Sequence, residues 1–349
     1  MGTVGTVLVA ILVFGFLIFI HEFGHYIFAR IFGVTITEFS IGMGPKLVWY
    51  DSKKTGIRYA LSMIPIGGYV AMVGEDGESE DPNSFDKKPA WQRFIITIAG
   101  ASINIIAGFI AMLILAVAVD FGGTTVALFL DTEETGYEIS SSESGLCEGD
   151  EILSVNGKRV RIADELSYQI MRYGNEPVDL VVLRDGESIP LNDVVFPTAE
   201  ESDQVFGMMD FKVYRTEKTF GSVMSYSFSK GVLIVRMCWE SIYDLIVGRY
   251  TIAAVSGPVG ISETIGDAAK AGFTSLLYIT ALISINLGVM NLLPIPALDG
   301  GRMIAILFEM ITRRRIPPKI EGTINAVGLM LLLFLSFIIM IKDIIGLFA

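Results

Sequence analysis

The sequence predicts a multi-pass α-helical membrane protein with four transmembrane helices and an extracytoplasmic, mainly-β domain. Its 349 residues are 52% hydrophobic and only 18% charged, against roughly 25% charged residues in soluble domains. The mean hydropathy is correspondingly high, at +0.57. Four stretches contain no Lys, Arg, Asp or Glu, and each can hold a membrane-spanning helix of ~20 residues. These stretches are residues 1–20, 94–119, 271–298 and 322–341.

The charges between these stretches predict how the chain is oriented. Residues 30–93 carry eight Lys and Arg and residues 302–319 carry five, so both segments are expected in the cytoplasm. Residues 121–273 carry 24 acidic and 12 basic side chains, which accounts for the whole net charge of −12 and predicts an extracytoplasmic position. An acidic chain is also a poor nucleic-acid binder. The predicted spans are residues 4–31, 94–119, 273–296 and 322–341, with both termini outside.

The two histidines of the chain both lie in the first predicted span, in the segment His21-Glu22-Phe23-Gly24-His25. Residues i and i+4 share one face of a helix, so His21 and His25 can offer imidazole nitrogens to one metal ion, with Glu22 beside them to act on water. Ordinary surface or core histidines are the alternative. Because ionisable groups inside a span are costly unless they are paired or bind a metal, the setting favours a zinc site.

A catalytic zinc site takes three ligands from the protein, so a third ligand must come from elsewhere in the chain. The best candidate is Asp299, which ends the third charge-free stretch after Pro294 and Pro296. Two prolines break a helix and free backbone groups, which a membrane tolerates only where protein or a water cavity surrounds them. The alternative is that Asp299 caps a cytoplasmic helix end.

Two motifs together resemble the site-2 protease family of intramembrane zinc metalloproteases, in its bacterial RseP type. They are the His21 to His25 segment and residues 291–300, with the sequence NLLPIPALDG. Residues 65–70, 74–75, 100–104 and 256–261 are also similar to segments of that family. The resemblance implies one zinc ion bound by His21, His25 and Asp299, with Glu22 as the catalytic base.

The resemblance further implies a set of substrate-binding residues. Residues 64–73 are similar to the membrane-reentrant β hairpin of the family, in which the Gly67-Gly68 pair indicates a turn and the edge could add a strand to an extended substrate. For the two asparagines near the end of the third span, hydrogen bonding between helices is the alternative. The implied substrate-binding residues are Gly67, Gly68, Asn286, Asn291, Pro294 and Pro296.

The acidic segment contains a pattern that is similar to the core of PDZ domains. Residues 145–157 predict a turn, a short strand and a hairpin at Asn156-Gly157. Residues 163–173 fit an amphipathic helix, and two short strands flank a turn at Asp185-Gly186. One PDZ domain is expected in residues 123–200, where it would bind extended substrates or exclude bulky ones.

The chain is therefore expected to have four parts. The N-terminal membrane part, residues 1–122, includes a cytoplasmic or reentrant β loop at 32–92. The PDZ domain at 123–200 is followed, after a polar linker near residues 199–204, by a post-PDZ region at 201–270 and the C-terminal membrane part at 271–349. Residues 231–248 carry one charged stripe, which predicts an interfacial helix rather than a fifth span. Cys147 and Cys238 are expected to be unpaired.

The expected function is that of a zinc-dependent intramembrane endopeptidase in regulated intramembrane proteolysis. By resemblance, its substrates are transmembrane segments of single-pass proteins, such as anti-sigma factors or remnant signal peptides, and its location is the bacterial inner membrane. The active site is expected in the cytoplasmic half of the lipid bilayer, in a monomer with no nucleic-acid partner. The alternative is a non-proteolytic PDZ adaptor or ion carrier, which would need the metal ligands but not Glu22.

Overall fold

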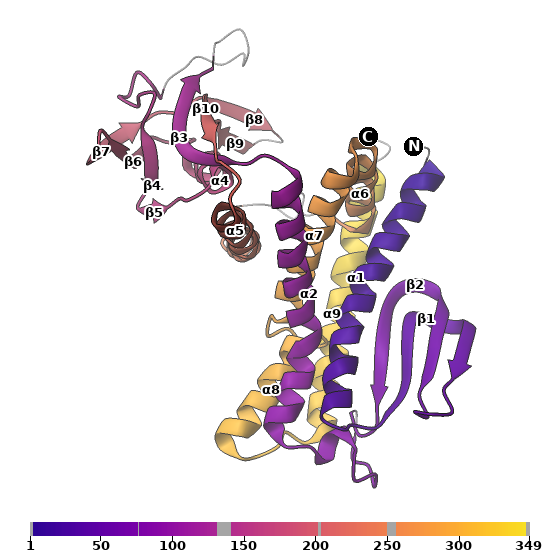
Figure 1. Cartoon of the computed structure of the whole chain (residues 1–349). Coiled ribbons are helices and arrows are strands. Elements are labelled where there is room, and N and C mark those ends of the chain that lie inside the picture. Colours follow the sequence, from indigo (N-terminus) through magenta and orange to yellow (C-terminus); the bar gives the residue numbers. More distant parts are fainter. Residues whose placement is uncertain (1–2, 76, 131–140, 202–203, 250–255, 347–349) are drawn as a thin grey trace. The chain divides into compact units, whose positions relative to one another are not determined.

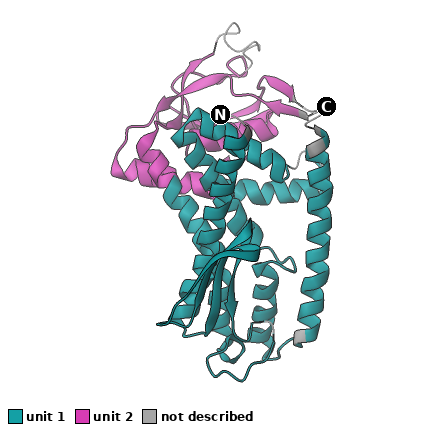
Figure 2. Ribbon diagram, turned by 90° about the vertical axis from the view of Figure 1, so that its right-hand side faces the viewer, with its two compact units in different colours: residues 1–111, 234–349 teal, residues 112–233 magenta. Residues whose placement is uncertain are grey.

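The computed structural model describes residues 3–75, 77–130, 141–201, 204–249 and 256–346 (Figure 1). The chain divides into two compact units, shown in different colours in Figure 2. Unit 1 comprises residues 1–111 and 234–349, and unit 2 comprises residues 112–233. Unit 1 is thus built from both ends of the chain, and unit 2 from the segment between them.

Each of the four predicted spans is a helix. They are α1 (Thr3–Ile31), α2 (Ala90–Ala118), α7 (Phe273–Asn291) and α9 (Pro318–Gly346). All four are long and apolar enough to cross a membrane. The third ends at Asn291 rather than at residue 296, because Pro294 and Pro296 lack the backbone N–H that a continuing helix requires.

Glycines let the helices of unit 1 approach each other closely. A Cβ atom at Gly24 of α1 would lie 2.7 Å from the backbone oxygen of Ala99 on α2, and one at Gly288 of α7 would lie 2.6 Å from that of Ala101. Both distances are shorter than any side chain allows, so these backbone contacts require glycine. They fix α1 and α7 against the same turn of α2.

Among the described residues of unit 1, three further helical segments are not predicted by the sequence. A 3₁₀ helix, η1 (Phe85–Lys87), precedes α2. Helix α6 (Pro258–Ala271) packs on α1, where Ile265 joins a buried cluster with Ala10 and Leu17. Helix α8 (Asp299–Thr312) begins where the chain leaves the proline-containing connection, so Asp299 stands in its first turn.

Strands β1 (Ile36–Asp51) and β2 (Arg58–Met72) form an antiparallel two-stranded sheet beside α1 (Figure 1). Residues 38–41 of β1 pair with residues 58–61 and also with residues 68–71, so β2 lies on both sides of this part of β1. Residues 58–61 run in the same direction as residues 38–41, whereas residues 68–71 run in the opposite direction, so β2 reverses its direction between residues 61 and 68, in the region of the turn predicted at Gly67-Gly68. Gly67 has a φ of +84°, which glycine adopts without strain, where β2 passes from one set of partners to the other.

Unit 2 contains a six-stranded sheet with the order β10-β3-β4-β6-β7, in which β5 also pairs with β4. Its strands are β3 (Gly122–Phe129), β4 (Glu151–Val155), β5 (Lys158–Arg159), β6 (Val178–Arg184), β7 (Glu187–Val194) and β10 (Phe211–Arg215). The predicted helix is confirmed as α4 (Ala163–Tyr173). The turns at residues 156–157 and 185–186 are confirmed, because all four residues have positive φ between flanking strands.

The boundary predicted for this domain at residue 200 is too early. Strand β10 pairs with β3 at the edge of the sheet, so residues 211–215 belong to the same domain. Residues near the predicted polar linker form a hairpin of β8 (Thr198–Glu201) and β9 (Gln204–Gly207). The polar residues near position 200 suggest the end of the domain. They give no sign that β10, which follows them, pairs with the distant strand β3.

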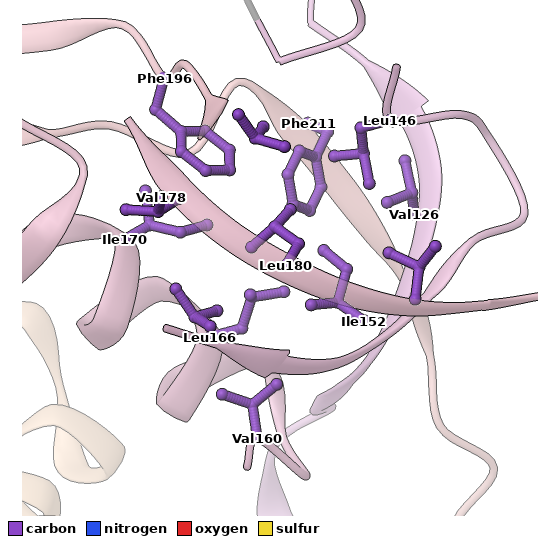
Figure 3. Packing of buried hydrophobic residues seen from close by; sticks show 13 residues of the cluster. Val126, Leu146, Ile152, Val160, Leu166, Ile170, Val178, Leu180, Phe196 and Phe211 are labelled. Atoms are coloured by element: carbon purple, nitrogen blue, oxygen red, sulfur yellow. The ribbon is translucent and has the colours of Figure 1, made fainter. Parts of the chain in front are cut away.

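The core of unit 2 lies between the sheet and α4. Thirteen buried hydrophobic residues form one cluster, in which Leu166 and Ile170 of α4 pack toward Leu180 of β6 and Phe211 of β10 (Figure 3). Leu166 and Ile170 are one helical turn apart, so the periodicity predicted for α4 produces this packing. The contact between Phe211 and the rest of the cluster explains why β10 is part of the domain.

Helix α5 (Phe220–Ile246) contains most of the segment predicted as an interfacial helix. It is not among the four described helices that are apolar enough to cross a membrane. Cys238 on α5 and Cys147 are both free thiols, as expected.

Asp150 is the buried anchor of the loop before β4, and Asp150→Asn is expected to destabilise unit 2 by about 3–5 kcal/mol at neutral pH. Its side chain is 1% exposed and accepts hydrogen bonds from the backbone N–H of Cys147 at 2.9 Å and from Nε and Nη2 of Arg184, both at 2.7 Å. Burial raises the pKa of Asp150, but these hydrogen bonds outweigh burial and hold the pKa below its usual value. Hydrogen exchange of β4 and β6 amides in the whole protein measures the loss.

The effect should depend on pH in one direction. A depressed pKa stabilises the fold above the unfolded value near ~3.9, and that contribution disappears as the pH falls through the folded pKa. The difference between Asp150→Asn and wild type should therefore shrink in acid. Asp185→Asn makes the same chemical change at an exposed turn residue with a φ of 52°, and should cost less than about 0.5 kcal/mol. Equal exchange rates in both variants would contradict the prediction.

Candidate metal centre

Three potential metal ligands meet where α1 passes the start of α8. His21 and His25 stand one turn apart on α1, and Asp299 is the first residue of α8. Oδ2 of Asp299 lies 3.1 Å from Nε2 of His21 and 3.3 Å from Nε2 of His25, and the two Nε2 atoms are 3.3 Å apart. Within the described part of the chain, no other three His, Cys, Asp or Glu side chains converge closely enough to hold a metal ion.

The arrangement fits zinc. Zinc holds nitrogen and oxygen ligands at about 2.0–2.1 Å in a tetrahedron, which places neighbouring ligand atoms about 3.3 Å apart. The two Nε2 atoms and Oδ2 form a triangle with sides of 3.1, 3.3 and 3.3 Å. Oδ2 of Asp299 is also buried without a hydrogen-bond partner among the described residues, which is costly for a carboxylate unless a cation is close. Two imidazoles and one carboxylate leave a fourth position for a reacting molecule.

Helix α2 orients His25 and makes room for both imidazoles. Nδ1 of His25 lies 2.8 Å from the backbone oxygen of Ile96 and donates to it, so the proton stays on Nδ1 and the lone pair of Nε2 faces Asp299. A Cβ atom at Gly100 would lie 2.4 Å from Nε2 of His25 and 2.9 Å from Nε2 of His21. Sequence reasoning missed both roles: Gly100 was only one residue of a family-like segment, and Ile96 acts through its backbone.

Glu22 lies beside the three ligands. Its carboxylate is close enough to His25, His21 and Asp299 to interact with them electrostatically. A Cβ atom at Gly68 of β2 would lie 3.0 Å from Cγ of Glu22. The β1–β2 sheet therefore reaches Glu22 at a residue that has no side chain.

Ion pairs hold α8, which carries Asp299. Glu309 accepts hydrogen bonds from Arg93 of α2 at 2.6 Å and from Arg315 at 3.0 Å. Burial raises the pKa of Glu309, but the hydrogen bonds from the two arginines outweigh burial and lower it. Arg302, one turn after Asp299, pairs with Glu75. These contacts fix both ends of α8 relative to α2 and the segment after β2.

Asn286 and Asn291 lie in α7, and Pro294 and Pro296 lie in the connection between α7 and Asp299 at the start of α8. Asn291 ends α7, and its side chain donates to the backbone oxygen of Leu287 at 2.9 Å. The side chain of Asn286 is half-buried, and the hydrogen bond of the Asn291 side chain stays within α7. The connection containing Pro294 and Pro296 rests on α9, where the backbone N–H of Ala297 donates to Oδ1 of Asn325 at 3.2 Å. No hydrogen bond or ion pair of the described structure joins these residues to His21, His25 or Asp299.

Known proteins similar to this chain are zinc metalloproteases. The profile of peptidase family M50 matches residues 9–335. A Clostridium acetobutylicum protein named "Putative zinc metalloprotease" is 33% identical over 97% of both chains, and a Clostridium perfringens protein of that name is 34% identical over 97% of this chain and 98% of its own. Zinc metalloprotease RasP of Shouchella clausii is 27% identical over 99% of this chain and all of its own. The chain belongs to peptidase family M50, the site-2 protease family, and is a zinc metalloendopeptidase of the membrane.

Proposed function

We propose that the protein cleaves peptide bonds within transmembrane segments, with zinc held by His21, His25 and Asp299. The observation that carries this proposal is the convergence of these three side chains beside Glu22, on a helix that is apolar enough to span a membrane. A soluble protease has no need to keep such a site on a membrane helix, where ionisable groups are expensive.

Within this site, Glu22 is the catalytic base. When bound, zinc supplies Lewis-acid chemistry, which polarises the scissile carbonyl and makes an attacking water more acidic. Glu22 takes a proton from the attacking water and passes it to the leaving amine as the C–N bond breaks. His21, His25 and Asp299 hold their positions throughout, since the contacts to Ile96 and the ion pairs of α8 restrain them.

The β1–β2 sheet is proposed to present the substrate to this site. A helical substrate hides its peptide bonds and must unwind before cleavage. Residues 68–71 of β2 pair with β1 on one side only, and no other described strand pairs with their free edge. An extended substrate could add there as a strand, with Gly68 next to Glu22. Asn286, Asn291, Pro294 and Pro296 would hold the substrate from the opposite side, while Gly67 shapes the strand.

Exposed apolar side chains support the placement of this sheet within the membrane. Leu47, Val48, Trp49 and Met63 are between 56% and 65% exposed in the chain alone. Such a patch on one sheet would be unfavourable in water. We therefore propose that the sheet is reentrant and contacts lipid.

Unit 2 is proposed to be an extracytoplasmic PDZ domain that recruits or excludes substrates. Its net negative charge and its confirmed hairpins and helix support that proposal, as does the cytoplasmic position that the positive-inside rule predicts for the basic segments. Substrates would then be single-pass proteins, such as anti-sigma factors or remnant signal peptides, in regulated intramembrane proteolysis. The active site would lie in the cytoplasmic half of a bacterial inner membrane, in a monomer with α5 at the membrane surface.

Metal removal tests this proposal. Incubating the purified protein in detergent with a zinc chelator should abolish cleavage of a single-helix reporter, and one equivalent of zinc should restore it, because the three side chains form a single site. Mass spectrometry of the products should place the cut inside the apolar segment of the reporter. The matched control is a reporter with the same residues in a soluble, extended peptide. Cuts confined to flanking polar residues, or cleavage unaffected by the chelator, would contradict the proposal.

A further inference from the structure

Asn104 is a buried polar residue of α2 that faces the metal centre from behind His21. Its side chain is completely buried, and its amide nitrogen lies 3.4 Å from Nδ1 of His21. Its Oδ1 atom is buried without a hydrogen-bond partner among the described residues. A buried carboxamide with an unpaired oxygen is unfavourable in an apolar helix bundle. We therefore expect this oxygen to gain a partner when the metal is bound.

The protonation of His21 decides how the Asn104 side chain must be oriented. Nε2 of His21 is the nitrogen that faces Asp299 and His25, so it must be the metal ligand and must be free of its proton. A neutral imidazole then carries the proton on Nδ1, which becomes a donor. The amide nitrogen of Asn104 is also a donor and cannot accept this proton. With that nitrogen toward Nδ1, the proton of His21 would stay on Nε2 and block metal binding.

A half-turn of the carboxamide about the Cβ–Cγ bond resolves the conflict. The amide oxygen and the NH₂ group are similar in size and are placed symmetrically on Cγ. They therefore exchange places without moving the rest of the side chain. Oδ1 then accepts the Nδ1–H of His21. Nothing else in α2 has to shift, and the backbone oxygen of Asn104 keeps its hydrogen bond from Oγ of Ser284 at 2.8 Å.

We infer that Asn104 is a positioning residue whose Oδ1 accepts the Nδ1–H of His21 in the zinc-loaded enzyme, as the backbone oxygen of Ile96 does for His25. Both acceptors stand on α2, separated by about two turns. One helix thereby sets the tautomer and ring orientation of both histidines. Hydrogen bonds of this kind raise the basicity of the ligand, and their removal weakens metal binding about 10–100-fold.

The test is the zinc affinity of the purified whole protein, measured by competition with a chromogenic chelator. Asn104→Leu keeps the branching of the side chain at a larger volume and removes the acceptor, and should weaken zinc binding about 10–100-fold. Asn104→Asp keeps oxygen acceptors and lacks the amide donor, so it should stay within about threefold of wild type. Ser284→Ala is the matched control, since it perturbs the same contact between α2 and α7 without touching the carboxamide.

Two outcomes would overturn the inference. Asn104→Leu with wild-type zinc affinity would show that no acceptor is needed. Asn104→Asp as weak as Asn104→Leu would show that the amide nitrogen, rather than the oxygen, serves His21. If gel filtration in detergent shows that the leucine variant does not fold, the zinc affinity of the aspartate variant alone tests the inference. The absorption spectrum of the cobalt-substituted variants provides a second readout, because a misoriented imidazole changes the coordination geometry.

This inference rests on the proposed ligand set, and one further variant separates the two. His21→Ala should lose stoichiometric zinc. Zinc retained by that variant would sink the proposed ligand set itself, whereas zinc lost there but kept in Asn104→Leu would overturn only the role of Asn104.

Discussion

Replacing Glu22 by Gln is expected to lower the rate of cleavage by about 10²–10⁴-fold while zinc stays bound. Glutamine has nearly the same shape but cannot take a proton from the attacking water. The ligand atoms of His21, His25 and Asp299 are untouched by this change, so zinc content should remain at one per chain. Single-turnover cleavage of a transmembrane reporter gives the rate, and elemental analysis of the same sample gives the zinc content.

The control for Glu22 is the same substitution at an exposed glutamate. Glu263 lies on α6 in unit 1, where its side chain is exposed. Glu263→Gln should cleave the reporter at the wild-type rate. A Glu22→Gln enzyme that retained more than about a tenth of wild-type activity would assign the proton transfer to another group. Loss of zinc from this variant would instead mean that Glu22 holds the metal.

Adding a single methyl group at Gly100 is expected to remove most of the zinc. A Cβ atom there would lie 2.4 Å from Nε2 of His25 and 2.9 Å from Nε2 of His21. It would be fixed to the backbone of α2, so the imidazoles have to move instead. At least one imidazole must turn away, and a displacement of about 1 Å in a catalytic constellation costs about 10²-fold. Gly100→Ala should therefore show zinc affinity and cleavage that are each reduced at least 100-fold. Titration with a zinc buffer in detergent measures the affinity.

Gly15 provides the matched control for this substitution. It lies on the same helix as the two histidines, and a Cβ atom built there has nothing within 4 Å. Gly15→Ala should bind zinc like wild type. If Gly100→Ala also bound zinc normally, the imidazoles would not occupy the space beside α2 in the loaded enzyme.

The helices and the two histidines could be predicted because local patterns determine them. Charge-free stretches mark the spans, and the i, i+4 spacing places His21 and His25 on one face without any knowledge of the fold. The position of Asp299 was a prediction of a different kind, since it depended on where the chain turns after α7. The structure brings Asp299 to the histidines because the prolines end α7 and α8 starts at that residue.

What the sequence could not predict are contacts made between distant segments. Ile96 supports His25 with a backbone oxygen, which no side-chain pattern reveals. The pairing of residues 38–41 with two stretches of β2, one on each side, depends on the path of the chain through Gly67, and the Gly-Gly pair alone does not predict which strand lies on which side. Strand β10 joins β3 across nearly the whole of unit 2, and short strands with a long sequence separation carry little local signal.

The assembly of unit 1 from both ends of the chain affects the timing of biosynthesis. A ribosome releases α1 with its two histidines first, then all of unit 2, and only afterwards the residues from 234 onward. Asp299 emerges late, so a nascent or truncated polypeptide carries two of the three proposed ligands and no complete catalytic centre. The newly made enzyme would thus remain inactive toward neighbouring membrane proteins until its C-terminal helices have been inserted.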